Sequence, residues 1–315
     1  MSIKLGVLLW SQGSDWARFE EAARRVDELG YDHLWTWDHL YAIFGNPYQD
    51  IFEGWMALAA WAKVTSRIRL GLLVGANSFR HPGLVAKLVT TLDHQSEGRA
   101  ILGLGGAWFE LEHEAFGIEF GRSPGERLGW LDEAAGLITR LLAGEVVSHH
   151  GERYHAEELR IVPGPVAGRR LPLMIGGGGE QKTLRTVARY ADMWNAFGDI
   201  PTLERKIGVL RRHCEEVGRD FTEIDCTVGC KPVIRDTEDE ARRVFEALME
   251  ANQTPRSRVE GDQSFWIGTP AQIAERIIGY RELGFATIIS EIPAPYDQET
   301  LERLVGEVKP LVDAG

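Results

Sequence analysis

The chain has 315 residues, of which 44% are hydrophobic, and its formal net charge is −12 at pH 7. This length suffices for two average domains or one large α/β barrel, and the hydrophobic fraction is ordinary for a protein with a sizeable core. Because phosphate groups are bound by clustered Lys and Arg, the acidic balance without a long basic run argues against nucleic acid and anionic membrane surfaces as partners.

The sequence shows no sign of a membrane or secretory segment. No apolar run approaches the roughly 18 residues of a membrane helix, and the N-terminus lacks a charged region followed by an apolar one. The three cysteines, Cys214, Cys226 and Cys230, are too few and too irregularly spaced for a disulfide framework or a zinc site. We therefore expect a cytoplasmic protein with buried or partly buried cysteines and no metal site.

Eight short apolar runs are expected to form strands. The first, Ile3–Trp10, is nearly continuously apolar and ends at the polar turn Ser11–Gly13, which is typical of a strand buried on both faces. The eight expected strands are 3–10, 33–37, 68–75, 99–106, 171–177, 192–197, 224–234 and 286–292.

Helical segments are expected to follow these strands. In Asp15–Gly30 the apolar side chains recur at helical spacing, and Asp15 can cap the start of the helix and Gly30 its end. Pro82 and the pair Thr269–Pro270 are likewise typical of helix starts. The expected helices are 15–30, 52–66, a segment from 82, 125–144, 182–191, 202–218, 237–251, 269–284 and 298–312.

Two segments interrupt this alternation. Residues 144–170 contain two short alternating runs around the turn Gly151–Tyr154, which predicts a hairpin inserted between the fourth helix and the fifth strand. Residues 251–266 are polar and irregular, and we expect them to form a lid. Since no linker divides residues 1–315, we predict a single (β/α)8 TIM barrel, with a doubly wound open sheet as the alternative.

In such a barrel the active site is built from the loops after the carboxyl ends of the strands. The loop after the second strand contains Asp38 and His39, whose side chains diverge because the residues are adjacent. His39 is a candidate for proton transfer near neutral pH, with a structural histidine bonded to a backbone carbonyl as the alternative. His81, His94 and the hairpin histidines are expected to be structural or solvated.

A glycine-rich stretch, MIGGGGEQKT (Met174–Thr183), follows the fifth strand. It nearly matches a nucleoside-triphosphate loop, but Gln181 stands where that pattern requires its second glycine. Backbone N–H groups at the start of a helix bind phosphate, so the stretch predicts a site for a monophosphate or a diester, with a ligand-free tight turn as the alternative. The glycines concerned are Gly176, Gly177, Gly178 and Gly179.

Four of the ten tryptophans lie close together in the sequence. These are Trp35, Trp37, Trp55 and Trp61. They are expected either to pack the barrel or an interface, or to form a wall for a flat aromatic ligand.

Four segments, which span nearly the whole chain in order, resemble a known family. They are GYDHLWTWDH (30–39), RIRLGLLVGANSFRHPGLVAKLVTTLDHQSEGRAILGLGGAWFELEHEAFG (67–117), LPLMIGGGGEQKTLRTVARYADMWN (171–195) and GTPAQIAERIIGYRELG (268–284). On these segments the chain resembles the luciferase-like monooxygenase superfamily of flavin- and deazaflavin-dependent oxidoreductases. The second segment is the most specific, with its F-R-H-P, S-x-G-R, L-G-x-G and W-F-x-x-E patterns.

The resemblance implies a (β/α)8 barrel that binds coenzyme F420 or FMN, and it favours the F420-dependent branch. It implies that His39 transfers a proton and that a non-proline cis peptide lies in the bulge after the third strand. The implied cofactor contacts are Asp38, Leu73, Val74, Gly75, Ala107, Trp108 and, for the phosphate, Gly176, Gly177, Gly178 and Gly179. The implied activity is hydride transfer between F420 and a small organic substrate.

One position departs from part of the family. Members that oxidise a sugar phosphate have a glutamate where Trp108 stands here, so the resemblance does not extend to that substrate. The bulky Trp108 suits an apolar or aromatic substrate better. Glu112 is the nearest carboxylate in the same loop, and we expect it either to take part in catalysis or to order the loop.

Two other functions are compatible with the same barrel. One is an FMN-dependent monooxygenase that uses oxygen and receives reduced FMN from a partner reductase, and the other is a non-catalytic flavin-binding barrel. The polyglutamate tail of F420 would favour a basic groove, for which Arg80, Lys182 and Arg185 are candidates. A homodimer is possible, because the apolar helix 54–62 suits either a core or an interface.

Overall fold

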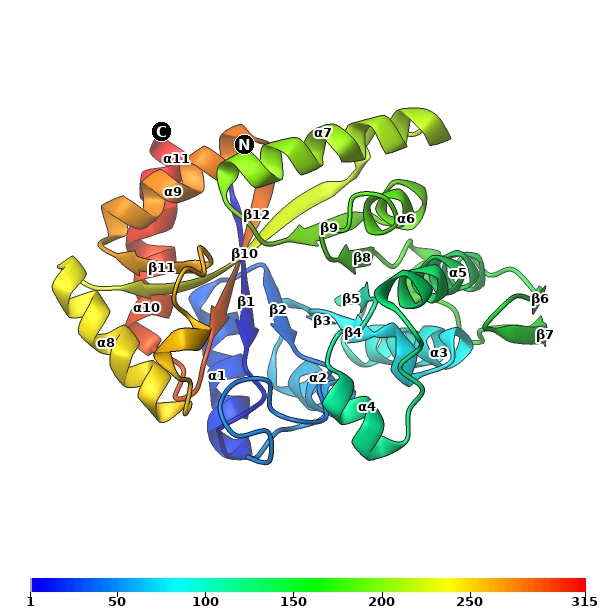
Figure 1. The fold of residues 1–315 in the computed structure, drawn as a ribbon, viewed down its shortest axis with the longest axis horizontal. Helices are drawn as coiled ribbons and strands as arrows, with labels where there is room; N and C mark the ends of the chain where they lie inside the picture. Colours follow the sequence, from blue (N-terminus) through cyan, green and yellow to red (C-terminus); the bar gives the residue numbers. More distant parts are fainter. Residues whose placement is uncertain (1) are drawn as a thin grey trace.

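The computed structural model describes residues 2–315 and has at its centre a closed barrel of eight parallel strands, as predicted (Figure 1). The ring closes because β1 pairs with β12 and β9 pairs with β10. The barrel strands are β1 (Lys4–Leu9), β2 (His33–Thr36), β3 (Arg69–Leu72), β5 (Ala100–Gly105), β8 (Leu173–Gly176), β9 (Met193–Ala196), β10 (Asp225–Ile234) and β12 (Phe285–Ile292). Side chains fill the inside and helices cover the outside, so these strands are buried almost throughout.

The helices around the barrel begin and end at the expected signals. Asp15 accepts a hydrogen bond from the N–H of Arg18 at the start of α1, and Gly30 adopts the left-handed conformation at its end. Thr269 and Gln272 form a capping box at the start of α9. The helices that cover the barrel are α1 (Trp16–Leu29), α2 (Gly54–Val64), α3 (Pro82–Gln95), α5 (Pro124–Leu142), α6 (Thr183–Tyr190), α7 (Ile200–Val217), α9 (Pro270–Glu282), α10 (Gln298–Arg303) and α11 (Lys309–Ala314).

Three short elements were not expected. The helix α4 (Glu110–Phe116) starts without a side-chain capping hydrogen bond, so its sequence lacks the usual start signal. The strand β4 (Gly75–Ala76) has only two residues and pairs with β5. The strand β11 (Phe265–Gly268) begins within the last two residues of the segment that looked irregular, and its four residues are too few to show a period.

The long strand β10 continues beyond the barrel. Its second half, Lys231–Ile234, pairs with β11, and this extension carries α8 (Glu238–Ala251), which lies at the left edge of Figure 1. Residues between α8 and β11 fold back toward the carboxyl ends of the barrel strands, and Arg258 donates to the carbonyl of Ile43 at 3.3 Å.

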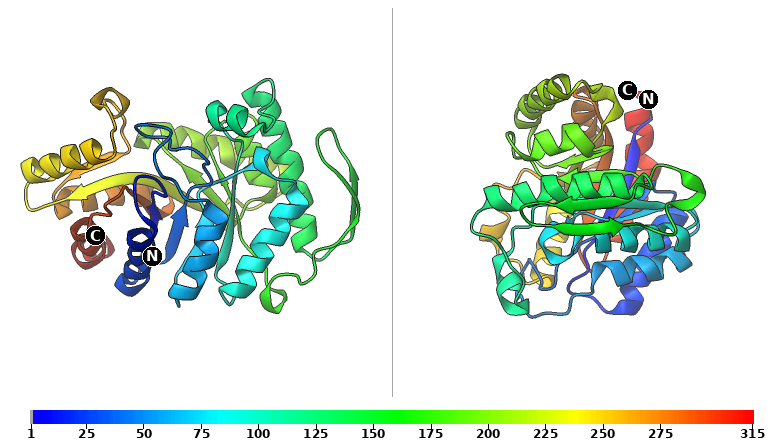
Figure 2. Two further views of the ribbon diagram at one scale, coloured as in Figure 1. Left: turned by 90° about the horizontal axis from the view of Figure 1, so that it is seen from below. Right: turned by 90° about the vertical axis from the view of Figure 1, so that its right-hand side faces the viewer.

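A hairpin lies between α5 and β8. Its strands, β6 (Val147–His150) and β7 (His155–Leu159), pair antiparallel and project from the side of the molecule (Figure 2). Val147, Tyr154 and Ile161 pack against α5, so the hairpin buries its apolar side on the outside of the barrel.

Most apolar side chains of the tryptophan-rich segments are buried in the core. Trp35 and Trp61 are fully buried, and Trp55 is 8% exposed, so these three pack the interior. The helix α2 directs its other apolar side chains inward and leaves Met56 exposed. All three cysteines are buried, as expected. Within residues 2–315 no helix combines the length and the apolar character needed to cross a membrane.

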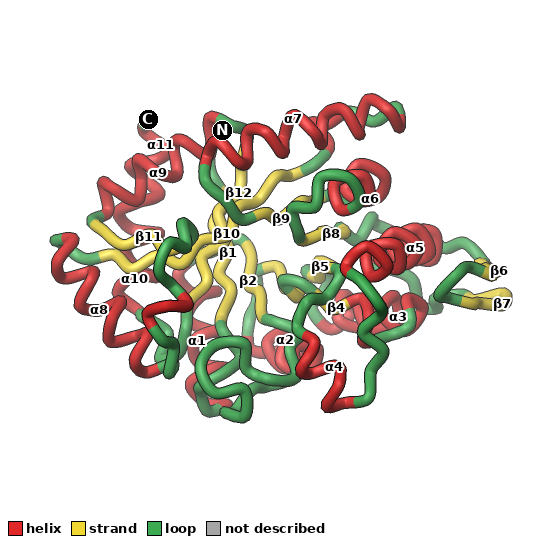
Figure 3. Tube along the Cα trace, in the orientation of Figure 1, coloured by secondary structure: helices red, strands yellow, loops and turns green. Residues whose placement is uncertain are grey.

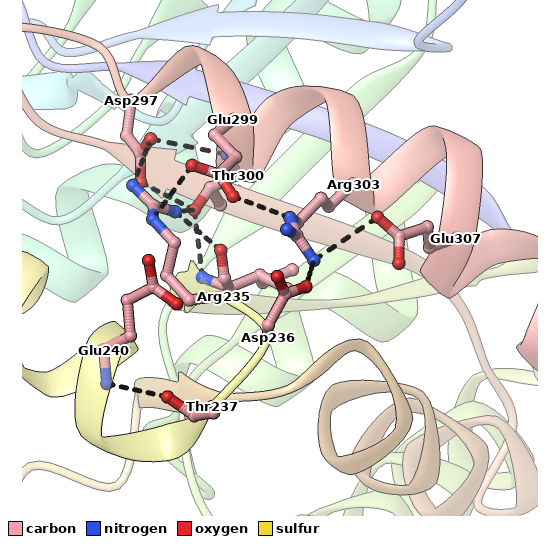
Figure 4. A network of polar contacts seen from close by, with 10 residues as sticks. Arg235, Asp236, Thr237, Glu240, Asp297, Glu299, Thr300, Arg303 and Glu307 are labelled. Atoms are coloured by element: carbon pink, nitrogen blue, oxygen red, sulfur yellow. Dashed lines mark hydrogen bonds and ion pairs between the residues drawn. The ribbon is translucent and has the colours of Figure 1, made fainter.

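A buried arginine fixes the end of β10 to the C-terminal helices, which Figure 3 shows packed beside it. Arg235 contacts Asp297 at 2.9 Å and Glu299 at 3.1 Å, and the backbone N–H of Ile234 donates to Thr300 (Figure 4). Since Asp297 also caps α10, this network joins the end of β10 to the chain that follows β12. It thereby positions two strands whose side chains reach the site described below.

Candidate active site

A cavity of about 450 Å³ opens at the carboxyl ends of the barrel strands. Of the twelve residues predicted to be catalytic or to contact the cofactor ring or its phosphate, ten lie on its wall. Those on the wall are Asp38, His39, Leu73, Val74, Gly75, Ala107, Trp108, Glu112, Gly176 and Gly177. Gly178 and Gly179 lie farther along the glycine-rich loop and do not line the cavity.

Asp38 is buried at the side of the cavity, and only one of its two carboxylate oxygens has hydrogen-bond partners. Its Oδ2 accepts hydrogen bonds from Arg80 at 2.7 Å and from the backbone N–H of Ala76 at 2.9 Å. Its Oδ1 is buried and has no partner among the described residues. Burial raises the pKa of Asp38, while the charge of Arg80 opposes this shift. Asp38 lines the cavity, and its Oδ1 is a buried polar atom that lacks a hydrogen bond within the described residues.

His39 points away from Asp38 and is paired with Glu112. Its Nδ1 lies 2.9 Å from Oε1 of Glu112, and Oε2 of Glu112 accepts from the backbone N–H groups of Leu40 and Tyr41. Glu112 is 1% exposed and comes from α4. An ionised carboxylate only accepts hydrogen bonds, so with Glu112 in that form Nδ1 is the donor of this bond, and in the tautomer that bears only this hydrogen Nε2 is an acceptor.

The bulge after β3 contains a cis peptide bond between Leu73 and Val74, at the place implied by the resemblance. Val74 points toward two barrel glycines. A Cβ on Gly105 would lie 2.6 Å from Val74 Cγ2, and one on Gly176 would lie 2.9 Å from Val74 Cγ1. The missing side chains at these glycines therefore make room for the bulge.

The glycine-rich loop joins the end of β8 to α6. Gly177 has φ +126°, a conformation open mainly to glycine, and Thr183 at the start of α6 lines the cavity beside it. The ammonium group of Lys206, from α7, occupies the space that a Cβ of Gly178 would need. Partial burial lowers the pKa of Lys206. The loop thus combines close backbone access, a hydroxyl group and a cation.

Ala107 and Trp108 form the part of the rim beside this loop, because they follow β5, which pairs with β8. Ala107 has φ +57°, and the backbone in this left-handed conformation turns Trp108 toward the opening. The side chain of Trp108 is 59% exposed and meets His39 edge to face, with ring centroids 5.5 Å apart. Trp37 lines the cavity on the same side, whereas the other members of its sequence cluster are in the core.

The far end of the cavity carries two oppositely charged side chains whose contact was not predicted from the sequence. Lys231 comes from β10 and Glu291 from β12, and Lys231 Nζ lies 3.8 Å from Glu291 Oε2. The indole N–H of Trp10 donates to the same oxygen at 3.3 Å. Glu291 was noted only as a residue after the eighth strand, and the spacing of 60 residues gives no sequence signal for the contact.

One expectation about the basic groove is wrong. Arg80 does not provide a free cation, because its guanidinium group is bound to Asp38 at 2.7 Å and to Glu53 at 2.9 Å. Its side chain is only 16% exposed. Arg80 precedes α3 and is not among the residues that line the cavity; it holds Asp38 from behind the wall.

His81 and His94 make structural contacts, as expected. His81 accepts from the N–H of Gly83 and caps α3, and His94 contacts the carbonyl of Gly164. In the part of the chain that the structure describes, no three His, Cys, Asp or Glu side chains come together in a way that could hold a metal ion.

Residues 3–287 match the family model described as luciferase-like monooxygenase. The chain therefore belongs to the luciferase-like monooxygenase family and is an enzyme of that class. It is 29% identical over 313 residues to an F420-dependent glucose-6-phosphate dehydrogenase from Microbacterium testaceum (strain StLB037), with 90% of this chain and 89% of the relative covered.

Solved structures share the fold. An F420-dependent secondary alcohol dehydrogenase in complex with an F420-acetone adduct has a TM-score of 0.83 and 18% identity, with 99% of each chain covered. A riboflavin lyase with modified FMN and riboflavin has a TM-score of 0.81 and 15% identity, with 100% of this chain and 92% of the other covered. At these identities the likeness extends to the fold alone.

Proposed function

We propose that this member of the luciferase-like monooxygenase family is an F420-dependent oxidoreductase that transfers a hydride between the deazaflavin and a small organic substrate. The observation that carries the proposal is the pair His39–Glu112 beside the unsatisfied Oδ1 of Asp38, on one cavity wall. The pair offers a proton acceptor, and Asp38 offers a bonding partner for a polar ring.

The residues present suit a flat ring with a phosphate-bearing side chain. Asp38 Oδ1 needs a hydrogen-bond partner, and the bulge at Leu73–Val74 gives the cavity an apolar floor. The glycine-rich loop lets a phosphate approach the backbone of Gly177 near Thr183, and Lys206 supplies a positive charge close by. In this arrangement Asp38 and Val74 hold the ring, and the loop holds the phosphate.

When bound, the deazaflavin supplies a ring carbon that donates or accepts a hydride. The protein supplies the proton partner. Glu112 fixes His39 with Nε2 as the acceptor, so Nε2 takes the hydroxyl proton of an alcohol substrate and returns it in the opposite direction. Glu112 acts through His39 and the backbone of the loop, which makes it a positioning residue.

The relative from Microbacterium testaceum supports F420 over FMN, because it covers most of both chains and its name states F420 dependence. The fold does not separate the two cofactors, since structures with F420 and with FMN both resemble it. We therefore keep FMN-dependent oxygenation as the second candidate. We also propose that residues 251–266 cover the site, because Arg258 bonds to the Ile43 carbonyl at its edge.

The proposal is tested by turnover with F420. Purified protein and oxidised F420 are mixed with a panel of small alcohols, and the visible absorption of the deazaflavin is followed. The expected result is reduction with at least one alcohol by the wild-type protein and its loss in His39→Gln. Tight FMN binding together with oxygen uptake on adding reduced FMN, and no reaction with F420, would overturn the proposal.

A further inference from the structure

The far end of the cavity differs in character from the end that carries the glycine-rich loop. Its polar groups are Lys231 and Glu291, and Lys231 is 9% exposed. Neither residue has a part in the proton transfer assigned to His39. A buried ion pair on a cavity wall requires an account, because desolvating two charges is costly unless they bond to each other and to further groups.

The charges at this end are balanced within the protein. Lys231 Nζ lies 3.8 Å from Glu291 and 3.8 Å from Asp262, and it donates to Ser264 Oγ at 2.8 Å. Burial raises the pKa of Glu291, while Lys231 and the Trp10 N–H oppose the shift. Lys231 is the single Lys or Arg among the described residues that line the cavity, and it faces two carboxylates. An anion bound to Lys231 would be repelled by both carboxylates.

Lys231 still has hydrogen-bonding capacity. An ammonium group has three donors, and one of them is used by Ser264. Beyond its polar partners, Lys231 has aromatic neighbours: its Nζ lies 5.4 Å from the ring centroid of Phe197, and Phe44 and Ile43 line the same cavity. This is the arrangement that orients a mainly apolar ligand through one polar atom.

We propose that Lys231 and Glu291 form the subsite that orients the substrate, and that the substrate is an uncharged, mainly apolar or aromatic alcohol or carbonyl compound whose polar end bonds to Lys231. Glu291 sets the specificity, because its charge cancels that of Lys231 and rejects phosphate and carboxylate groups. This inference rests on the proposed function for the existence of a substrate, and it separates this chain from its sugar-phosphate-oxidising relative.

The test compares three probes of known charge by isothermal titration calorimetry on the F420-loaded protein. Benzaldehyde is neutral, benzoate has nearly the same shape with a negative charge, and glucose 6-phosphate carries a phosphate. Wild-type protein is expected to bind benzaldehyde at least about ten-fold more tightly than benzoate and to bind glucose 6-phosphate no better than benzoate. In Glu291→Gln, Lys231 keeps Asp262 but loses the carboxylate on the cavity wall, and the ratio is expected to shift toward benzoate by about ten-fold or more.

A matched control is Glu282→Gln, which removes a carboxylate at the exposed end of α9 and should leave the ratio unchanged. Preference of wild-type protein for benzoate or glucose 6-phosphate would overturn the inference, and so would an unchanged ratio in a folded Glu291→Gln protein. If that variant does not fold, the wild-type ratio still decides.

The titrations are repeated without cofactor. A protein that binds no F420 but still prefers benzaldehyde would refute the proposed function and leave the subsite in place. A protein that binds F420 and prefers the anions would refute the subsite and leave the proposed function in place.

Discussion

Nδ1 of His39 lies 2.9 Å from Oε1 of Glu112, although the two residues are 73 positions apart in the chain. The other oxygen of Glu112 accepts from the backbone of Leu40 at 2.8 Å. One buried carboxylate therefore fixes both the ring of His39 and the loop that carries it. In the proposed function this relationship favours one tautomer of His39 and leaves Nε2 as the ring nitrogen that exchanges a proton with the substrate.

Replacing His39 with Gln should abolish most of the turnover without loss of cofactor. Proton transfer by a positioned side chain contributes roughly 10²–10⁴-fold, so kcat should fall by that factor while the Kd for F420 stays within about two-fold. Steady-state kinetics and a fluorescence titration measure the two quantities. His150→Gln, an exposed histidine on the hairpin, is the control and should behave as wild type. A His39→Gln protein with full kcat and intact F420 binding would disprove the role.

Replacing Glu112 with Gln should lower kcat more than it changes KM. The amide can still accept from the loop N–H groups, but it does not hold the Nδ1 hydrogen as a carboxylate does, so the ring is less well oriented. We expect kcat to fall roughly 10–100-fold and the unfolding free energy to fall by about 1–3 kcal/mol. A purely structural role would change stability and leave kcat of the folded fraction unchanged, which kinetics after gel filtration would reveal.

Replacing Lys206 with Gln should weaken cofactor binding. Its ammonium group lies against Gly178 of the loop assigned to the phosphate, so its loss removes a charge-assisted contact worth about 1.5–3 kcal/mol. The Kd for F420 should rise by about ten-fold or more, and the effect should shrink with added salt. Arg212→Gln, on the same helix and exposed, is the matched control. Equal F420 affinity in the wild type and Lys206→Gln would remove the phosphate from this loop.

His33 should make the fold sensitive to acid. Burial lowers the pKa of His33 from 6.5 to about 3, and its Nδ1 has no partner among the described residues. Between these values the unfolded chain binds one more proton than the folded chain, so stability is complete above pH 6.5 and falls as the pH falls toward 3. At pH 4.5 the loss is about 2–3 kcal/mol.

Urea unfolding at pH 7 and pH 4.5 measures this loss. In His33→Gln the part of the pH dependence due to this ring should disappear, although the variant is less stable at both pH values if the amide is poorly accommodated. His150→Gln provides the comparison, because that histidine is solvated in both states. The assignment fails if His33→Gln loses as much stability between the two pH values as the wild type does.

The barrel could be predicted because its signals are local and repeated. Each strand is a continuous apolar run, and helix starts such as Asp15 and Thr269 carry their capping residues in the sequence. The elements that escaped prediction, α4, β4 and β11, are short, and their stability comes from tertiary contacts rather than from period or caps. The polar segment that contains the start of β11 forms that strand because the extension of β10 offers it a partner.

The site divides in the same way. The loops after the strands could be placed by the barrel rule, so Asp38, His39 and the glycine-rich loop were found together on one cavity. Which side chains pair with each other could not be predicted from the sequence, because the pairing depends on distances across the barrel. Arg80 reads as a free cation in the sequence and is neutralised by Asp38 and Glu53 in the structure.

The cavity beside His39 should bind a deazaflavin in preference to FMN, and intrinsic tryptophan fluorescence measures this preference most directly. Trp37 lines the cavity and Trp108 stands at its rim, so a bound ring should quench the emission strongly. In parallel titrations with oxidised F420 and with FMN, we predict saturable quenching by F420 at a Kd at least about ten-fold lower than that for FMN. Tighter binding of FMN than of F420 would contradict the account.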